Sequence, residues 1–380
     1  MLKSLVEHHL GKVDRVETFL VDLPFKRLQR FARLDARAQT SLLIRITDQH
    51  GAQGIGEAIV PCGPWWSGDS VESMKIIIDT YLAPAMIGCE LSRFNAIFDT
   101  LARVARGNLL AKAGLEMACL DLIGKSLDVP VHVLLGGKRR ESCPIAWPLA
   151  SGDPAQDRTE IEDMLSTGRA SAFKVKAGAD DLQSDLRRIA DLTAALAGRA
   201  PLRIDPNESW SEMHALVALP QLVAMGVELI EQPVPREQMA VMGRITARSS
   251  VPIMIDEGVQ TDTDMAHCIE AEAAHMVSIK IMKSGGMGAA RRVADLAHTA
   301  GMPLYMGTFL ETGIGTAAGM HLAATLPSLP FGGEIFGPLL MQDDLLRDPM
   351  QYKQGAVWLP EGAGLGVQID DDKLRHYTRV

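Results

Sequence analysis

Hydrophobic and polar positions follow one regular pattern from about residue 143 to about residue 336. Short apolar runs rich in β-branched residues alternate with segments whose apolar positions recur at helical spacing, most clearly Leu182–Leu196 and Met287–Thr299. Strand patterns that alternate with helix patterns indicate a parallel sheet joined by crossover helices. We therefore predict that residues 138–345 form a modified (β/α)8 barrel of the TIM type.

The N-terminal part of the chain has a different pattern. Residues 16–23 and 41–46 are rich in strand-forming residues, and a turn sequence ending at Gly51 follows the second run. This order is typical of an antiparallel meander. Residues 71–127 then change to helical periodicity. Strands followed by helices predict a separate α+β domain over residues 1–137.

The ends of the chain and the junction between the domains carry weaker patterns. The segment 136–140 combines two glycines with three basic residues, and we place the domain boundary there. Residues 1–12 are expected to be an irregular extension. After Gly337 the alternation ends, and residues 346–380 are predicted to form a tail that returns to the N-terminal domain.

Three acidic residues stand at the ends of successive apolar runs. Asp205, Glu231 and Asp256 follow one another at intervals of about 25 residues, which is close to the length of one β/α unit. Charged side chains at the carboxyl ends of parallel strands gather at one mouth of a barrel, where barrel enzymes have their active sites. Three carboxylates at this mouth predict a site for Mg²⁺ or Mn²⁺. Asn207 follows Asp205 by two residues, so it points the same way and can orient a ligand.

Lysines flank the three acids in the sequence. Lys174 and Lys176 lie two apart on a predicted strand, so their side chains share one face and are expected to lower each other's proton affinity. A lysine of this kind can act as a general acid or base. Lys280 ends the apolar run after Asp256, which places it across the barrel mouth from the first two lysines. Lys283 is a weaker candidate, because it is expected to lie in the following loop.

The amino-acid composition excludes several classes of protein but does not indicate a reaction. The 380 residues are 47% hydrophobic and 22% charged, and the formal net charge of −9 gives no sign of binding to nucleic acid or to a membrane surface. Five scattered cysteines show neither disulfide-type nor zinc-type spacing, and neither a signal peptide nor a membrane span is expected. These features predict a cytoplasmic protein with a small-molecule partner.

Other common catalytic motifs are missing from the pattern. The segment around Gly313 and Gly315 lacks the third glycine that a dinucleotide-binding loop needs. No nucleophile-elbow sequence supports Ser-His-Asp hydrolysis. The acids and lysines at the strand ends therefore remain the candidate active site.

The strand-end motifs resemble those of one known family, the muconate-lactonizing subgroup of the enolase superfamily. The motifs are Phe-Lys-Val-Lys at 173–176, Ile-Asp-Pro-Asn at 204–207, Ile-Glu-Gln-Pro at 230–233, Ile-Asp-Glu at 255–257 and Ile-Lys at 279–280. A lysine stands at position 280, where the mandelate racemase branch has a histidine. Segments 146–153, 307–311, 314–316 and 333–340 are similar to those of bacterial muconate cycloisomerases. The resemblance covers roughly residues 13–375.

The resemblance implies a fold and a set of roles. It implies a capping domain over a modified barrel, and Mg²⁺ or Mn²⁺ held by Asp205, Glu231 and Asp256. It implies that two capping-domain loops, near residues 28–40 and 59–70, select the substrate. The second loop contains Trp65 and Trp66, which could wall a planar substrate or pack between the domains. Glu334 is a polar contact suggested by the resemblance alone, and the family's tendency to form large symmetric assemblies suggests a homo-octamer.

The resemblance also implies an activity. The expected reaction converts cis,cis-muconate, or a chloro- or methyl-substituted muconate, to a muconolactone through a metal-stabilised enolate. In this reaction Lys176 exchanges the proton with carbon, Lys174 contacts a substrate carboxylate, and Lys280 stabilises charge from the opposite face. The alternative is an N-acylamino acid racemase or dipeptide epimerase that uses Lys176 and Lys280 as an acid/base pair. A third possibility is a barrel protein that binds a carboxylate ligand without turnover.

Overall fold

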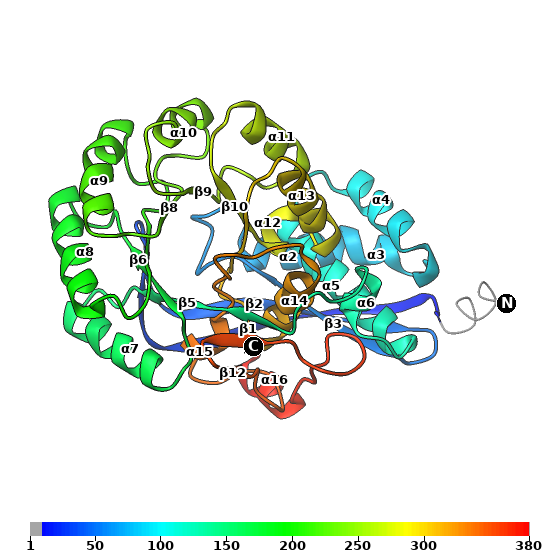
Figure 1. Cartoon of the computed structure of the whole chain (residues 1–380). Helices are drawn as coiled ribbons and strands as arrows, with labels where there is room; N and C mark the ends of the chain where they lie inside the picture. Colours follow the sequence, from blue (N-terminus) through cyan, green and yellow to red (C-terminus); the bar gives the residue numbers. More distant parts are fainter. Residues whose placement is uncertain (1–9, 380) are drawn as a thin grey trace.

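An antiparallel sheet of long strands forms one side of the molecule (Figure 1). The computed structural model describes residues 10–379, so residues 1–9 of the expected N-terminal extension lie outside the described range. The strands are β1 (Val13–Arg30), β2 (Asp35–Asp48) and β3 (Gln53–Ile59), and they pair in that order. Both predicted N-terminal strands are present and longer than expected. Only residues 31–34 separate β1 from β2, so most of the expected substrate loop 28–40 is a strand hairpin.

Helices follow the sheet, and the longest of them packs directly against β3. These elements are α2 (Val71–Ile77), η1 (Ile78–Leu82), α3 (Ala83–Met86), η2 (Leu91–Arg93), α4 (Phe94–Val104), α5 (Leu109–Ser126) and α6 (Val131–Leu134). Helix α5 is buried on nearly every side. Glycines let its backbone approach the sheet, because a Cβ at Gly54 or Gly56 would lie 2.2 or 2.1 Å from a carbonyl oxygen of α5.

The rest of the chain forms a parallel sheet of seven strands in the order β11-β10-β9-β8-β7-β6-β5. The strands are β5 (Ala146–Leu149), β6 (Ala172–Lys176), β7 (Leu202–Asp205), β8 (Leu229–Glu231), β9 (Ile253–Ile255), β10 (Met276–Ile279) and β11 (Leu304–Met306). Gly333 makes parallel bridges to both Ile145 and Met306, at the two edges of this sheet. The segment around Gly333 therefore takes the place of an eighth strand, and the fold is a modified TIM-type barrel.

Helices cover the outer face of the barrel, as Figure 1 shows for the arc from α7 to α13. The helices of this part are α7 (Pro154–Ser166), α8 (Leu182–Leu196), α9 (Glu212–Ala224), α10 (Met239–Thr246), α11 (Asp262–Glu270), α13 (Met287–Thr299) and α14 (Gly313–Thr325), with two short helices, α12 (Ile281–Ser284), which packs against α5, and α15 (Gly337–Leu340), which packs against α14 and β1. The predicted bounds of α8 and α13 agree with the structure. Each crossover helix covers apolar residues of the strands with its own apolar face.

The last part of the chain contacts both the barrel and the N-terminal sheet. β12 (Tyr352–Lys353) pairs with β13 (Ala356–Trp358), which pairs in turn with β4 (Ser142–Pro144). After α16 (Asp371–Tyr377), the backbone N–H of Arg379 donates to the carbonyl of Leu20 at 2.8 Å, and its guanidinium contacts Asp22 and Glu72. The domain boundaries at 137 and 345 stay a prediction.

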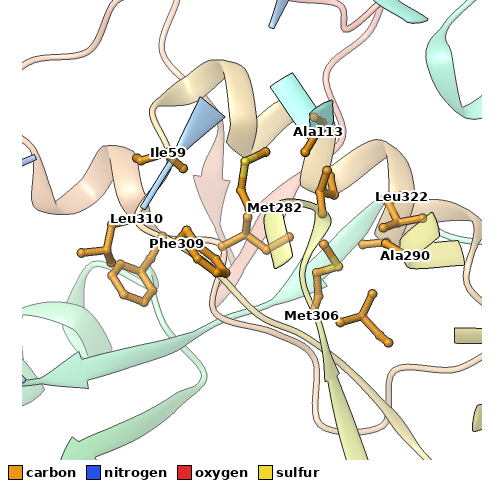
Figure 2. Close-up of a cluster of buried hydrophobic side chains, with 14 of the residues drawn as sticks. Ile59, Ala113, Met282, Ala290, Met306, Phe309, Leu310 and Leu322 are labelled. Carbon is orange, nitrogen blue, oxygen red and sulfur yellow. The ribbon is translucent and has the colours of Figure 1, made fainter. Parts of the chain in front are cut away.

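One apolar region joins the N-terminal part to the barrel, and another lies inside the barrel. Ile59 and Ala113, from the N-terminal part, meet Met282, Phe309 and Leu310 of the barrel in one buried cluster (Figure 2). A separate small cluster consists of Leu229, Met254, Met276 and Tyr305. Leu229 and Met254 precede Glu231 and Asp256 by two residues, so the strand period places them on the same inward face, below the mouth. The barrel interior is thus filled under the charged site.

No helix within residues 10–379 combines the length and the apolar character that crossing a membrane requires.

Candidate active site at the mouth of the barrel

The predicted strand-end residues occupy the carboxyl ends of adjacent strands. Lys176, Asp205 and Glu231 are the last residues of β6, β7 and β8, while Asp256 and Lys280 come directly after β9 and β10. Lys176 and Asp205 are paired in register on neighbouring strands. Parallel pairing without a register slip therefore brings residues that are far apart in the sequence to one mouth.

The lysines and carboxylates form ion pairs in this mouth. Lys176 Nζ lies 2.5 Å from Asp205 Oδ2, and Lys280 Nζ lies 2.5 Å from Asp256 Oδ2. Lys174 is completely buried, and its Nζ contacts Glu231 Oε2 at 2.6 Å. Lys176 and Lys280, which were predicted on opposite flanks of the acids, thus contact different carboxylates.

Glu334 reaches the same cluster from the Gly333 segment. It contacts the ammonium group of Lys174 directly. Because Gly333 bridges the sheet edges, the following residue enters the barrel mouth as an eighth strand-end group would. Glu334, which only the resemblance suggested as a polar contact, is therefore part of the cluster.

The expected mutual lowering of lysine proton affinity is wrong for Lys174. Burial lowers the pKa of its ammonium group, but the negative charges of Glu231 and Glu334 outweigh this effect and hold the pKa well above its ordinary value. Lys280 behaves in the same way, since Asp256 and Glu231 raise its pKa despite its burial. Neighbouring carboxylates, rather than neighbouring lysines, dominate the electrostatics of both groups.

Carboxyl groups outnumber lysine ammonium groups at the mouth. Five buried carboxyl groups meet four lysine ammonium groups there; the carboxyl groups are Asp205, Glu231, Asp256, Glu257 and Glu334, and the lysines are Lys174, Lys176, Lys280 and Lys283. Burial raises the pKa of Glu231 to about 8, even though Lys174 opposes it. Burial and the charge of Asp256 raise the pKa of Glu257 well above its ordinary value. The cluster therefore favours binding of additional positive charge.

The oxygen donors suit a hard divalent cation. Three buried oxygens in the cluster have no hydrogen-bond partner: Glu231 Oε1, Glu257 Oε2 and Asn207 Oδ1. Carboxylate and amide oxygens are the ligands that Mg²⁺ and Mn²⁺ prefer. Within residues 10–379, no three His, Cys, Asp or Glu side chains are already grouped as metal ligands. Lysine ammonium groups contact Asp205 and Asp256 instead, so cation binding requires these ion pairs to open.

The loops that follow the strands are held in strained conformations. Asn207, Glu208, Gln232 and Leu310 have φ of 44°, 65°, 32° and 66°, in the left-handed region that non-glycine residues rarely adopt. Each such residue costs about 1–3 kcal/mol, and such residues gather at functional sites. Gln232 compensates by accepting hydrogen bonds from the backbone N–H groups of Asp256 and Gly258 with its amide oxygen. This amide fixes the start of the loop that carries Asp256.

The N-terminal part supplies a wall of the site. Trp66 packs edge-on against Phe309 with the ring centroids 4.6 Å apart, and Trp65 packs against Phe31 at 5.3 Å. Both tryptophans line one cavity with Lys176 and Lys280. This cavity contains about 400 Å³ of empty space, part of which is open to solvent. The structure therefore places both tryptophans at the site, and Trp66 also packs between the two parts of the chain.

The remaining lining residues come from both parts of the chain. The cavity is lined by Gln29, Phe31, Pro61, Trp65, Trp66, Lys176, Asn207, Lys280, Thr308, Leu310, Glu334 and Phe336.

Two family descriptions match successive parts of this chain. Residues 15–136 match the mandelate racemase / muconate lactonizing enzyme N-terminal domain, and residues 156–373 match the enolase C-terminal domain-like family. Together the matches cover most of the sequence. The chain belongs to the muconate-lactonizing subgroup of the enolase superfamily.

Individual members of this subgroup are similar over almost the whole chain. A chloromuconate cycloisomerase of Cupriavidus pinatubonensis (strain JMP 134 / LMG 1197) is 51% identical over 95% of this chain and 97% of its own length. Muconate cycloisomerase 1 of Rhodococcus opacus is 40% identical over 96% of this chain and 98% of its own. A crystal structure of a muconate lactonizing enzyme from Pseudomonas fluorescens, complexed with muconolactone, superimposes with a TM-score of 0.96 at 40% identity, covering 97% of this chain and 100% of that one.

The sequence pattern missed several members of the cluster. Lys283 lies in α12 rather than in a loop, is almost fully buried, and donates to Asp256 Oδ1 at 2.9 Å and to the Asp256 carbonyl at 2.7 Å. Burial lowers its pKa. Glu257 accepts a hydrogen bond from Asn207 Nδ2 at 3.2 Å. The sequence signal for Lys283 was its spacing of three residues from Lys280, which is one helical turn.

Proposed function

We propose that this protein is a metal-dependent cycloisomerase that converts cis,cis-muconate, or a chloro- or methyl-substituted muconate, to a muconolactone. One observation carries the proposal: lysines on two flanks surround a buried group of carboxylates, in a chain with 51% identity to a chloromuconate cycloisomerase. The 40% identity to a muconate cycloisomerase leaves the substituent on the substrate open. The protein is thus proposed as an isomerase of aromatic catabolism.

The proposed metal ion is Mg²⁺ or Mn²⁺, held by Asp205, Glu231 and Asp256. The unpartnered Glu231 Oε1 and the excess of carboxyl groups support this assignment. A bound cation would stabilise the negative charge that develops on a substrate carboxylate during the reaction. Asn207, whose Nδ2 donates to Asp205 Oδ2 at 3.2 Å, would keep that carboxylate oriented.

The lysines are proposed to handle the proton and the charge. One substrate carboxylate closes the lactone ring by adding to the conjugated double bond, and the carbon next to the other carboxylate must then gain a proton. Lys176 is proposed to deliver this proton, because its side chain lines the cavity and is the least buried of the active-site lysines. Lys174, whose ammonium group Glu334 also contacts, is proposed to contact a substrate carboxylate. Lys280 is proposed to stabilise charge from the opposite flank.

Trp65 and Trp66 are proposed to wall the planar substrate. Both line the cavity, and Trp66 stacks beside the guanidinium of Arg236 at 4.8 Å, which restricts the ring. The cytoplasmic location, the homo-octameric assembly and the division into domains at residues 137 and 345 are likewise proposals from the sequence.

The direct test follows the ultraviolet absorbance of muconates with purified protein and Mn²⁺. We expect absorbance to fall for muconate or for one of its chloro or methyl derivatives, with a lactone as the product. If no muconate is consumed, the alternative is an N-acylamino acid racemase or dipeptide epimerase that uses Lys176 and Lys280 as its two bases. That activity would exchange the α-proton of N-succinylamino acids or dipeptides for deuterium in deuterated water.

A further inference from the structure

One polar side chain of the cavity comes from the hairpin tip of the N-terminal sheet. Gln29 lies on β1, is completely buried, and lines the same cavity as Lys176 and Lys280. Its amide nitrogen Nε2 has no hydrogen-bond partner. A buried donor without a partner is uncommon, because it costs about 1–3 kcal/mol relative to a paired one. The Gln29 Nε2 group is therefore available to donate a hydrogen bond to a ligand.

The orientation of the Gln29 amide is determined by its neighbour. Arg27 donates from NH1 to Gln29 Oε1 at 2.6 Å. A guanidinium has only donors, so the atom that it contacts must be the amide oxygen. The Nε2 group is consequently directed away from Arg27. The usual ambiguity between amide oxygen and nitrogen does not arise here.

Arg27 is itself fixed by the barrel. It contacts both oxygens of Glu160, at 2.6 and 3.1 Å, and donates to the carbonyl of Pro148 at 2.8 Å. Trp147 donates to the same Glu160 at 2.7 Å and lies beneath the guanidinium of Arg27. Gln29 is therefore held by a chain of contacts that begins on β5 and α7.

Other hydrogen-bond donors of the cavity are already engaged. Asn207 Nδ2 donates to Asp205 and Glu257, and the hydroxyl group of Thr308 donates to Glu311. Trp65 Nε1 donates to the carbonyl of Pro61. The Gln29 amide differs from these groups because its donor remains available for a ligand.

We propose that Gln29 is a substrate-binding residue whose Nε2 donates to the second carboxylate of the dicarboxylate substrate, the one that the bound metal ion would not hold. This inference rests on the proposed function. A neutral amide suits this task, because it supplies a donor without adding another cation to compete for the acids at the mouth. Arg27 acts as a positioning residue for Gln29.

The test compares adipate with hexanoate, two unreactive six-carbon acids that differ by one carboxylate. Their dissociation constants are measured by calorimetry on Mn²⁺-loaded wild type, Gln29→Met and Gln29→Glu. Gln29→Glu keeps an oxygen for Arg27 and replaces the donor by a negative group, whereas Gln29→Met removes both functions. Gln49→Met, on an exposed turn, is the control. Unfolding temperature and Mn²⁺ stoichiometry are checked for every variant.

We expect Gln29→Met to weaken adipate binding roughly 10- to 100-fold, the usual range for a hydrogen bond to a charged group, and to leave hexanoate binding unchanged. Gln29→Glu should weaken adipate binding further, since like charges repel. Equal losses for both acids would overturn the proposal and assign Gln29 a structural role. Unchanged adipate binding, as when water alone occupies the amide, would also overturn it. Failure of the proposed function is distinguishable, because it shows as wild type that consumes no muconate, whereas these constants need no turnover.

Discussion

Acidic side chains are buried in two regions of this molecule, and the two regions satisfy them differently. At the barrel mouth, Asp205 and Asp256 contact lysine ammonium groups. Between the N-terminal part and the barrel, Glu57 and Glu116 are also almost fully buried, but they accept hydrogen bonds from backbone N–H groups where barrel helices begin. Glu57 accepts hydrogen bonds from the start of α14, and Glu116 accepts them from the start of α13.

The second kind of contact fixes the position of the N-terminal part. Glu57, on β3, accepts from the backbone N–H of Thr312 at 3.0 Å, from that of Gly315 at 2.9 Å, and from the hydroxyl group of Ser41 at 2.7 Å. The first N–H groups of a helix lack partners within the helix, so a carboxylate from another element stabilises them. These bonds join the sheet to the segment that carries Thr308 and Leu310 of the cavity.

The difference teaches how to tell a working carboxylate from a structural one. An ammonium group can leave a carboxylate when a metal ion or a substrate arrives, because both partners are side chains. Backbone N–H groups cannot leave without moving a helix. Substitutions at the mouth should therefore change activity more than stability, and substitutions at the interface should do the reverse.

The largest expected effect is on activity, at Lys176. We expect Lys176→Ala to lower kcat for muconate by about 10²- to 10⁴-fold, the usual contribution of a general acid or base. The unfolding temperature should stay close to that of wild type, since the side chain is partly exposed. Initial rates from muconate absorbance and thermal unfolding measure the two quantities. Lys353→Ala, an exposed lysine of β12, is the control, and a Lys176→Ala enzyme that keeps a tenth of its activity would contradict the assignment.

The next effect is on metal binding, at Glu231. We expect Glu231→Gln to weaken Mn²⁺ binding by more than the ~10- to 100-fold typical of residues behind the metal ligands, because a direct ligand is lost. Chelation of the metal should abolish turnover in wild type. Electron paramagnetic resonance of free Mn²⁺ gives the affinity without relying on activity. Glu228→Gln, whose carboxylate contacts Arg203 near the other end of the same strand, is the matched control.

At the interface the expected effect is a change in the pH dependence of stability. Burial raises the pKa of Glu57 to about 7, despite the hydrogen bonds from Thr312 and Ser41, from an ordinary value of 4.5. Between these two values the folded protein holds more protons than the unfolded chain. The free energy of unfolding therefore falls as pH rises from about 4.5 to about 7, by up to about 3 kcal/mol.

Glu57→Gln removes this proton, so we expect the variant to lose that part of the pH dependence. Burial also raises the pKa of Glu116 to about 7, so adding Glu116→Gln should flatten the decline further, while the part due to Glu231, whose pKa is raised to about 8, should remain. Denaturant unfolding at pH 5, 6 and 7 measures the slope for each variant. An unchanged slope in the double variant would show that these two acids are not the source of the effect.

The smallest expected effect lies at the surface, where the tail meets the N-terminal sheet. Arg379 contacts Asp22 at 2.7 Å and Glu72 at 2.6 Å, but all three side chains are more than a third exposed. We expect Arg379→Ala to cost less than about 1 kcal/mol of stability at low salt, and less still at 0.5 M salt. Denaturant midpoints at both salt concentrations check this. A loss as large as that at Glu57 would show that the tail contributes more than its exposed contacts suggest.

Much of the barrel could be predicted from the sequence because its signals are local. The period of two in strands and the helical spacing between them correctly located β6, β7, β8 and the helices α8 and α13. The eighth strand could not be predicted, because the Gly333 segment makes only isolated bridges and has no strand pattern of its own. The hairpin of β1 and β2 was also longer than expected, since residues 28–40 mix polar and apolar residues and its tip is set by the pairing of Gln29 with Ala36 and of Arg30 with Asp35.

Within the site, the pattern predicted the residues at strand ends, whereas Trp65, Trp66 and Glu334 were suggested only by the resemblance and also line the cavity. Asp205, Glu231, Asp256, Lys174, Lys176 and Lys280 meet as expected, and their catalytic and metal-binding roles stay predictions. Lys283 was misplaced because α12 has only four residues, too short for a periodic signal. Gln29 lies in the segment 28–40 that the resemblance assigns to substrate selection, but nothing in the sequence distinguished it from its neighbours.

The sequence by itself determined which side chains line the mouth from the barrel, because a parallel sheet carries each strand-end residue to the same edge regardless of what surrounds it. Only the tertiary structure decided which groups of the N-terminal part join them. Gln29 reaches the cavity because Arg27 binds Glu160 across the interface, and Glu57 reaches the start of α14 because Gly315 leaves room there for its carboxylate. These contacts depend on how two separately patterned parts pack together, and no local periodicity encodes that packing.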